Sequence, residues 1–243
     1  MKLLFFILLF FFCLAEDTLS SYEAFDSILK EYVDSDGNVN YKGILENPYN
    51  FNQYFEFIEK ISPNSHPKYF KTNNEKMAYW INTYNALIIK LMIENPGKDI
   101  LNISMGHAIW LTKFRVGDEN ISLYKIEHQI LKKMNDPRIH FAINCGSKSC
   151  PPLGRRIFLP ETLDTQLEER AINFINNNSN VYIDYDSNTI FLNKIFKWYK
   201  KDFKNVKKYL LKYLDTPINY SDIKKFKIKY YDYDWSSNDW HNQ

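Results

Sequence analysis

The sequence predicts an α+β fold, a single domain in which several helices pack around a small β-sheet. Apolar residues recur at helical spacing in several segments, while residues 181–192 alternate as a β-hairpin does. A short apolar run at residues 139–143 reads as a buried strand. Residues 16–243 have the length of one ordinary domain and contain no internal repeat.

The first fifteen residues predict a secretory signal peptide. Lys2 precedes an almost pure Leu/Phe/Ile run, and Cys13 and Ala15 supply the small residues that a signal peptidase reads. The run is shorter than the roughly twenty residues of a membrane span, so we expect cleavage after Ala15; an uncleaved anchor is the alternative. The mature protein is therefore expected to be secreted, or lumenal in the secretory pathway, without strong membrane binding.

Charge and sequons fit this route. The formal net charge is +2, and this near balance predicts no nucleic-acid partner. Four Asn-X-Ser sequons predict a glycoprotein, and Asn177 lies in a polar run that makes it the best acceptor.

The first half of the chain predicts three amphipathic helices. The third is the strongest, because seven apolar residues repeat at three and four before Asn95-Pro96-Gly97 ends it. An acidic stretch around Asp36-Gly37 is a turn and not a calcium loop, because its glycine is misplaced and Leu45 stands where Glu is required. The predicted helices are Tyr22–Tyr32, Phe51–Ile61 and Lys76–Glu94.

Two asparagines lie one turn apart inside the third helix. Asn82 and Asn85 are poor helix formers, so their place on one face needs a reason. Either they anchor neighbouring loops, or they form the polar wall of a pocket.

The second half predicts further helices, a strand and a hairpin. Ser122 caps a helix that carries Glu127 and His128 near its middle. The last helix carries a lysine-rich face, Lys197–Lys208, which we expect to face solvent and to bind nothing strongly. The tail at residues 230–240 is expected to pack back on the domain. The elements are a helix Leu123–Met134, a strand Ile139–Ile143, a helix Pro160–Asn176, strands Val181–Tyr185 and Thr189–Leu192, and a helix Phe196–Leu214.

The segment Ile139–Leu153 concentrates the reactive residues. It holds His140 and the two cysteines that remain after signal cleavage, Cys145 and Cys150, the second followed by two prolines. A nucleophilic thiol, a small disulfide and a metal site would all use such a segment.

Several motifs together resemble one known family. They are Met77–Leu87, Ser122–His128, Asp136–Cys145, Ser149–Leu153, Leu192–Tyr199, Asp202-Phe203 and Tyr233–Ser236. In this order they resemble the family called "domain of unknown function 547", and the resemblance covers a family-like core at about residues 20–240. The resemblance implies a domain but no reaction.

The cysteines leave three chemical readings open. A thiolate nucleophile needs a lowered pKa, which a nearby histidine supplies. A secretory compartment favours a Cys145–Cys150 disulfide. Zinc ligation by His128, His140, Cys145 and Cys150 is the third, although the C-x4-C spacing matches structural zinc sites only loosely.

We take a thiol-dependent enzyme of hydrolase or acyl-transferase type as the leading hypothesis. Cys145 would be the nucleophile, His128 or His140 the base, Glu127 or Asn144 the orienting group, and amides near Gly146 the oxyanion site. Glu127 is expected to hold His140 and not its direct neighbour.

The substrate would be a small molecule or peptide that the sequence does not identify, and no cofactor is predicted. Asn82, Asn85, Asn144 and Trp110, with His107 near the tryptophan, are the candidate binding residues. A non-catalytic binding domain stapled by Cys145–Cys150 and a metal-binding domain are the alternatives.

Overall fold

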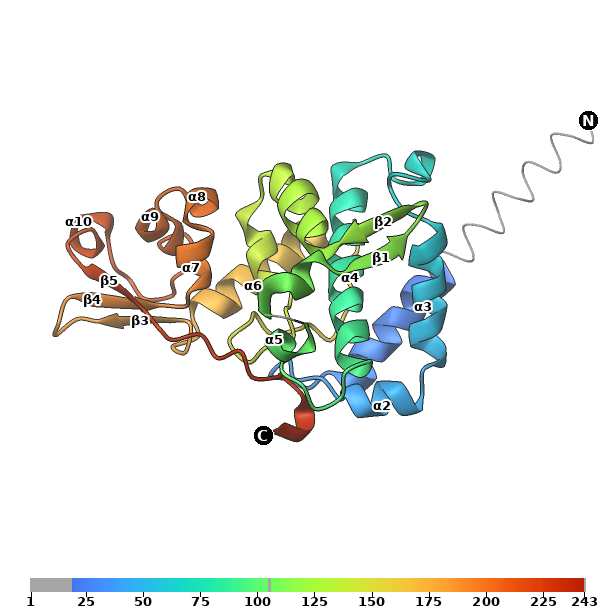
Figure 1. Cartoon of the computed structure of the whole chain (residues 1–243). Helices are drawn as coiled ribbons and strands as arrows, with labels where there is room; N and C mark the ends of the chain where they lie inside the picture. The colour runs from blue at the N-terminus through green and yellow to red at the C-terminus, as the bar shows by residue number, and fades with distance from the viewer. Residues whose placement is uncertain (1–18, 105, 243) are drawn as a thin grey trace, which may run out of the picture.

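The computed structural model describes residues 19–104 and 106–242 and contains two buried clusters. The larger cluster belongs to the helices around α4, and the smaller to a three-stranded sheet and the short helices that lie beside it (Figure 1). The predicted α+β class is confirmed. The predicted signal peptide, residues 1–15, lies outside the described residues. Within them, no helix combines the length and apolarity needed to cross a bilayer.

The larger part is built around α4, Asn73–Ile93, whose residues from Met77 to Ile89 are all buried. A capping box starts this helix, because Thr72 accepts from the Glu75 amide while the Glu75 carboxylate accepts from Thr72. The three predicted helices of the first half are confirmed. Around α4 pack a helix at residues 19–32, α2 (Tyr41–Glu46), α3 (Tyr49–Lys60), α5 (Ile100–Ile103) and 3-10 turns at Pro67–Tyr69 and Gly106–Leu111.

An antiparallel hairpin that the sequence did not predict follows. Strand β1, Lys113–Val116, pairs with β2, Glu119–Ser122, with Phe114 opposite Ile121. The predicted helix after Ser122 is helical throughout, but its centre is a π-helix, Lys125–Ile130, followed by a 3-10 turn, Leu131–Met134. Single π turns occur often at functional sites, and this one carries Glu127 and His128.

The predicted strand Ile139–Ile143 is wrong. The segment Pro137–Phe141 is a 3-10 helix, begun by Asp136, whose carboxylate accepts from the Arg138 amide. The Arg138 guanidinium then pairs with Asp136 and with α6, which fixes the turn against that helix. A buried apolar run of five residues fits a strand or a helical turn equally well.

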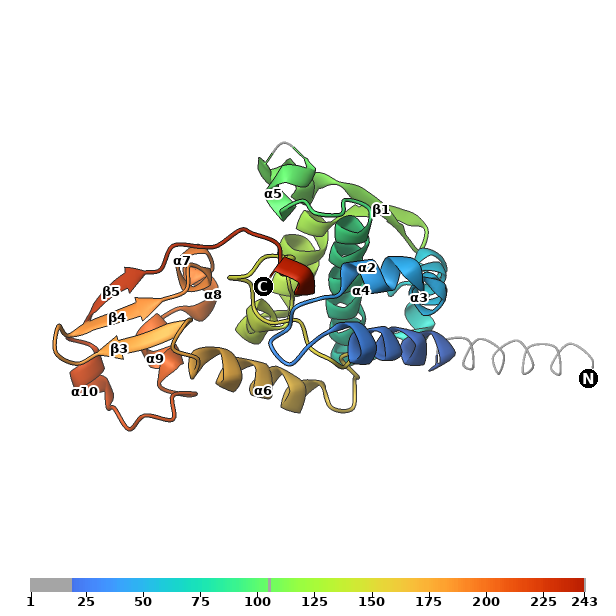
Figure 2. The ribbon, with the colours of Figure 1, turned by 90° about the horizontal axis from the view of Figure 1, so that it is seen from below.

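The smaller part holds a mixed sheet of three strands in the order β3-β4-β5. The predicted hairpin is confirmed, and an unpredicted strand β5 runs parallel to β4. Helix α6 connects the two parts and lies along the underside in Figure 2. The elements are α6 (Leu163–Ile175), β3 (Val181–Asp184), β4 (Thr189–Leu192), α10 (Tyr220–Ile223) and β5 (Lys227–Tyr230).

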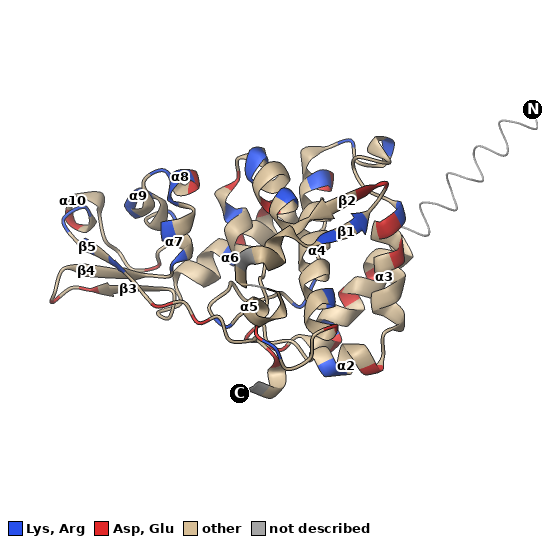
Figure 3. Ribbon diagram, viewed as in Figure 1, with Lys and Arg blue, Asp and Glu red and all other residues tan. Residues whose placement is uncertain are grey.

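The predicted long helix Phe196–Leu214 is also wrong. The chain forms three short helices, α7 (Ile195–Trp198), α8 (Lys200–Phe203) and α9 (Val206–Leu210). Lys204 adopts φ 58°, which ends α8, and Asn205 accepts from the Lys208 amide to begin α9. The lysines therefore form no single helix face. Figure 3 shows basic positions gathered over α7–α9. Six lysines lie between residues 197 and 208; Lys207 is half-buried and the other five are exposed.

The tail packs back on the larger part, as predicted. After β5 it crosses toward the cysteine segment (Figure 1), where Ser147 bridges to Ser237. Asn238 is buried, its amide donates to the Gly146 carbonyl, and it accepts from the Tyr41 hydroxyl at 2.6 Å. A 3-10 turn, Trp240–Asn242, follows.

Candidate functional site

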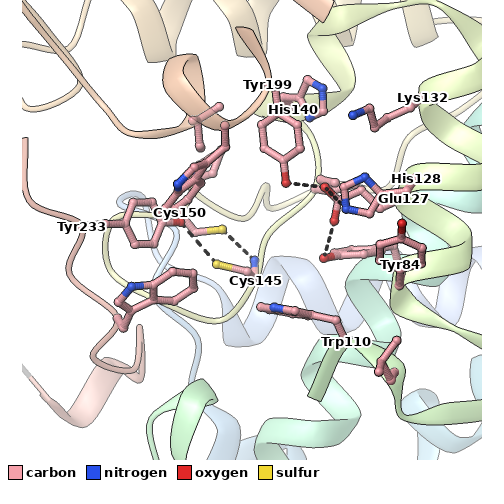
Figure 4. A pocket seen from close by; sticks show the side chains of 17 residues that line it. Tyr84, Trp110, Glu127, His128, Lys132, His140, Cys145, Cys150, Tyr199 and Tyr233 are labelled. Atoms are coloured by element: carbon pink, nitrogen blue, oxygen red, sulfur yellow. Dashed lines mark hydrogen bonds and ion pairs between the residues drawn. The ribbon is translucent and has the colours of Figure 1, made fainter. Parts of the chain in front are cut away.

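A pocket of about 540 Å³ lies where the two buried clusters meet. Cys145 and Cys150 stand on one side, and Glu127, His128, Lys132 and His140 on the other (Figure 4). The walls between them are mostly aromatic, and they include Tyr84, Trp110, Tyr124, Trp198, Tyr199 and Trp235. Such a cavity, apolar with a few convergent polar groups, is typical of a small-molecule site.

A network of asparagine side chains holds the cysteine segment. The Asn144 amide donates to Asn85 of α4, and the Asn144 side chain donates to the Pro151 carbonyl at 2.8 Å and accepts from the Gly146 amide at 2.7 Å. Gly146 has φ 80°, and a side chain there would also crowd Met92. The turn that presents Cys145 is thus fixed by its own residues and by α4.

The Cys145 thiol is half-buried and surrounded by hydrogen-bond donors. Its Sγ lies 3.0 Å from Ser147 Oγ and 3.4 Å from the Tyr233 hydroxyl. Burial raises the pKa of this thiol, but hydrogen bonds from Cys150, Ser147 and Tyr233 outweigh burial and lower it to about 7. Near neutral pH a large fraction of Cys145 is therefore thiolate.

Cys150 has the opposite character. Burial raises its pKa well above the usual range, and the neighbouring Cys145 raises it further. The Cys145 amide donates to Cys150 Sγ at 2.7 Å, which places the two residues side by side. Both cysteines are free thiols in this structure.

Glu127 forms the polar centre of the opposite wall. Its side chain is buried and accepts from the Tyr84 hydroxyl at 3.2 Å and from the Tyr199 hydroxyl. Burial raises the pKa of both phenols, so they remain donors at neutral pH. Figure 4 shows both hydroxyls pointing to this carboxylate from two walls of the pocket.

The two histidines differ from the sequence prediction. Glu127 does not hold His140, because Glu127 Oε1 lies 3.7 Å from Nε2 of its direct neighbour His128. His140 Nε2 instead contacts Asp202 at 2.8 Å, and its ring stacks on Tyr199. Burial lowers the pKa of His140 to about 4, against the opposing effect of Asp202, so this imidazole is neutral at pH 7.

Neither histidine is paired with the nucleophile candidate. Within the described residues, Cys145 makes no hydrogen bond or ion pair with a histidine, and Figure 4 shows both rings across the pocket from the sulfur. His128 is about one-third exposed and faces the cavity, so it is the histidine that a bound molecule could reach.

The candidate binding residues divide into two groups. Asn82 exchanges two hydrogen bonds with the backbone of Phe158, and Asn85 bonds both to Ala142 and to Asn144. These asparagines, with Asn144, anchor loops and do not line the pocket. Trp110 does line it, whereas the side chain of His107 lies outside the described part.

The predicted oxyanion amides are already in use. The Cys145 amide donates to Cys150 Sγ and the Gly146 amide to Asn144 Oδ1. Other donors near the sulfur include the hydroxyls of Ser147 and Tyr233 and the backbone amide of Ser147. These hydroxyls are the groups placed to stabilise negative charge beside Cys145.

Sequence reasoning missed the side chains that contact the predicted site residues. Tyr84, Tyr199 and Asp202, like Tyr233, lie inside the motifs that carry the family resemblance, and this was the one available signal. Ser147 lies between the two cysteines in the sequence, and this position alone could have suggested it. In the described part of the chain, no three His, Cys, Asp or Glu side chains gather as metal ligands do.

Comparison with known proteins gives one result. A family model described as "Protein of unknown function, DUF547" matches residues 68–175. No curated protein and no solved structure matches the chain. The match includes α4, the π-helix and the cysteine segment, while Tyr199 and Tyr233 lie beyond it. The family predicted from the motifs is thereby confirmed: residues 68–175 belong to the protein family of unknown function DUF547.

Proposed function

We propose that the chain is a thiol-dependent enzyme of acyl-transfer or hydrolase type, with Cys145 as its nucleophile. The observation that carries this proposal is the Cys145 thiol, whose pKa is lowered to about 7 by donors at the edge of an aromatic pocket. Nucleophilic cysteines are recognised by a depressed pKa and partial exposure, whereas structural buried cysteines lack both.

The reaction would pass through a thioester. The Cys145 thiolate attacks the carbonyl carbon of an ester, thioester or amide, the carbonyl electron pair moves to oxygen, and the Tyr233 and Ser147 hydroxyls donate to that oxygen. Collapse expels the leaving group, which takes a proton from a general acid. Water or an acceptor then attacks the thioester and restores the thiolate.

His128 is our candidate for the proton-transfer group. It lines the cavity, is partly exposed, and lies beside the Glu127 carboxylate. His140 is a weaker candidate, because burial keeps it neutral and Asp202 occupies its Nε2. We assign His140 to positioning Tyr199, on which it stacks.

A test is acylation by p-nitrophenyl acetate, followed by mass spectrometry of the intact and digested protein. We expect one acetyl group on Cys145, none in Cys145→Ser, and slower loss of the acetyl group in His128→Ala. Cys150→Ser is the matched control and should still be acylated at Cys145. Acetylation of lysines with an unmodified Cys145 would refute the proposal.

One observation favours a second candidate, a domain closed by a Cys145–Cys150 disulfide. The Cys145 amide reaches Cys150 Sγ at 2.7 Å, so the two thiols need little movement to bridge under an oxidant such as glutathione disulfide. Non-reducing mass spectrometry of protein isolated with a thiol trap separates the candidates. Two trapped thiols support the enzyme. A protein mass two hydrogens below that of the reduced protein, without a trap adduct, supports the Cys145–Cys150 disulfide.

We also propose the secretory route, because all four sequon asparagines are exposed. Expression in a eukaryotic secretory host should give material that begins at Glu16 and that shifts in mobility on treatment with an N-glycosidase. N-terminal sequencing that returned Met1 would contradict this route.

A further inference from the structure

A second cavity, of about 550 Å³, lies away from the cysteines. It is bounded by the helix at residues 19–32, by the segment at 155–159 and by the first turns of α6, and Figure 2 shows both helices along the lower edge of the molecule. None of its lining residues lines the Cys145 pocket. Whatever it binds is therefore independent of the proposed nucleophile.

Arg170 of α6 enters this cavity without a partner. Among the described residues, no carboxylate lies within ion-pair distance of its guanidinium, and it donates no hydrogen bond. Burial lowers the pKa of Arg170, and the exposed Glu169 opposes this only at longer range. Arg170 is partly exposed, and an arginine that lines a cavity without a counter-ion keeps its donors free for a bound acceptor.

The guanidinium lies against the backbone at Gly154. A Cβ at Gly154 would lie 1.6 Å from Arg170 Nη2, so a larger residue there would displace the end of the arginine side chain. Gly154 therefore serves the position of Arg170, and the two residues form one feature, although 16 positions separate them in the sequence.

The other charges of the cavity leave Arg170 available. Asp26 is already neutralised, because its carboxylate accepts from the Ile157 amide at 3.0 Å and pairs with Lys30 at 2.6 Å. Glu23 is exposed at the rim, like Glu169, and two further arginines, Arg155 and Arg156, stand there too. Arg155 donates to the Lys30 carbonyl, whereas Arg156 makes no ion pair or hydrogen bond in the described part of the chain.

We propose that this cavity is a binding site for a compact oxyanion, a carboxylate or phosphate group of a small molecule, with Arg170 as its main ligand. The planar guanidinium offers two parallel donors that match such a group. Arg156 contacts the anion from the rim, and Thr165 of the cavity supplies a hydroxyl donor.

The test measures binding of inorganic phosphate and of acetate by isothermal titration calorimetry, with chloride holding the ionic strength constant. Wild-type protein should bind at least one of the two. Arg170→Gln should weaken binding about tenfold or more, as expected for loss of a charged hydrogen-bond donor. Gly154→Ala, which keeps every charge but displaces the guanidinium, should weaken it as well.

Arg115→Gln, at an exposed arginine on β1, is the matched control and should bind as the wild type does. Preference for phosphate would identify a phosphate ester as the ligand class, and preference for acetate a carboxylate. The proposal is overturned if neither anion binds above the chloride background, or if Arg170→Gln and wild type bind equally.

Discussion

At the scale of single residues, the site depends on opposite effects of burial and hydrogen bonding. Cys145 and Cys150 occupy one small volume, yet the pKa of the first is lowered and that of the second is raised. Hydrogen bonds from Cys150, Ser147 and Tyr233 lower the pKa of Cys145 against burial, whereas burial and the neighbouring Cys145 raise the pKa of Cys150. One thiol is thereby activated while its neighbour stays protonated.

Removing a donor should reverse the activation. In Tyr233→Phe the thiolate loses a hydrogen bond, so the pKa of Cys145 should rise and the alkylation rate at pH 7 should fall several-fold. The measurement is the pH dependence of iodoacetamide alkylation at Cys145. Tyr182→Phe, at an exposed tyrosine on β3, is the control. An unchanged pH midpoint in Tyr233→Phe would show that this hydroxyl does not act on the sulfur.

His140 should make stability depend on pH. Its pKa is about 4 in the folded protein and about 6.5 in an unfolded chain, so the unfolded state takes up the proton first. Stability is fully present above about pH 6.5 and should fall by up to about 3 kcal/mol as the pH drops to 4.

Urea unfolding at several pH values checks this dependence. His140→Asn should flatten the decline between pH 6.5 and 4, because the variant has no imidazole to protonate at this position. His66→Asn, a loop histidine that contacts Ser65, serves as the control. Equal slopes for His140→Asn and wild type would assign the decline to other groups.

At the scale of elements, the loops of the site are anchored to α4. Asn85 accepts from the Asn144 amide and donates to the Ala142 carbonyl, and so holds both ends of the segment that leads to Cys145. Asn82 does the same for Phe158. These two polar residues inside a buried helix thus satisfy backbone groups of two loops.

Asn85→Ala should therefore cost about 1–3 kcal/mol, the usual penalty for leaving buried polar groups unpaired, and should slow Cys145 alkylation. Urea denaturation measures the first effect and iodoacetamide the second. Asn74→Ala, an exposed change near the start of the same helix, should stay within about 0.5 kcal/mol of wild type. If alkylation is unchanged despite lower stability, Asn85 supports the fold without placing the thiol.

The sequence predicts elements whose pattern is local and misses those that tertiary contacts decide. The helix at α4 has both periodicity and an end signal, so its prediction held. Residues 139–143 are apolar without a period, and the ion pairs of Arg138 with Asp136 and α6 settle them as a 3-10 turn. The period of residues 196–214 continues through both breaks of the helix, at Tyr199 between α7 and α8 and at Lys204, whose backbone is left-handed.

For the site, sequence reasoning identified Cys145, His128, Glu127 and Trp110 as members, and the structure places all four around one pocket. Their pairing was not predictable, because a π-helix and not an α-helix sets the direction of Glu127. Tyr233 lies 88 positions from Cys145, and no local pattern reports such a contact.

At the scale of the whole molecule, the tail completes the pocket. It leaves β5 in the smaller part and pairs with the cysteine segment, where Lys148 and Ser149 donate to the carbonyls of Ser236 and Asp234. It brings Tyr233 and Trp235 to the pocket wall and inserts Asn238 between Gly37 and Tyr41. The smaller part therefore contributes to the site through Tyr199 and through the tail that follows β5.

Loosening the tail should weaken the site before it unfolds either core. In Asn238→Ala the Tyr41 hydroxyl and the Gly37 carbonyl lose their partner, at a cost of about 1–3 kcal/mol. Tyr233 would then be held less firmly, so the pKa of Cys145 should rise toward its ordinary value. Deletion of residues 232–243 should raise it further, because Tyr233 is removed. Alkylation against pH and far-ultraviolet circular dichroism measure the thiol and the fold on the same samples. A deletion variant that is helical yet alkylates as wild type would show that the cysteine segment activates its thiol without the tail.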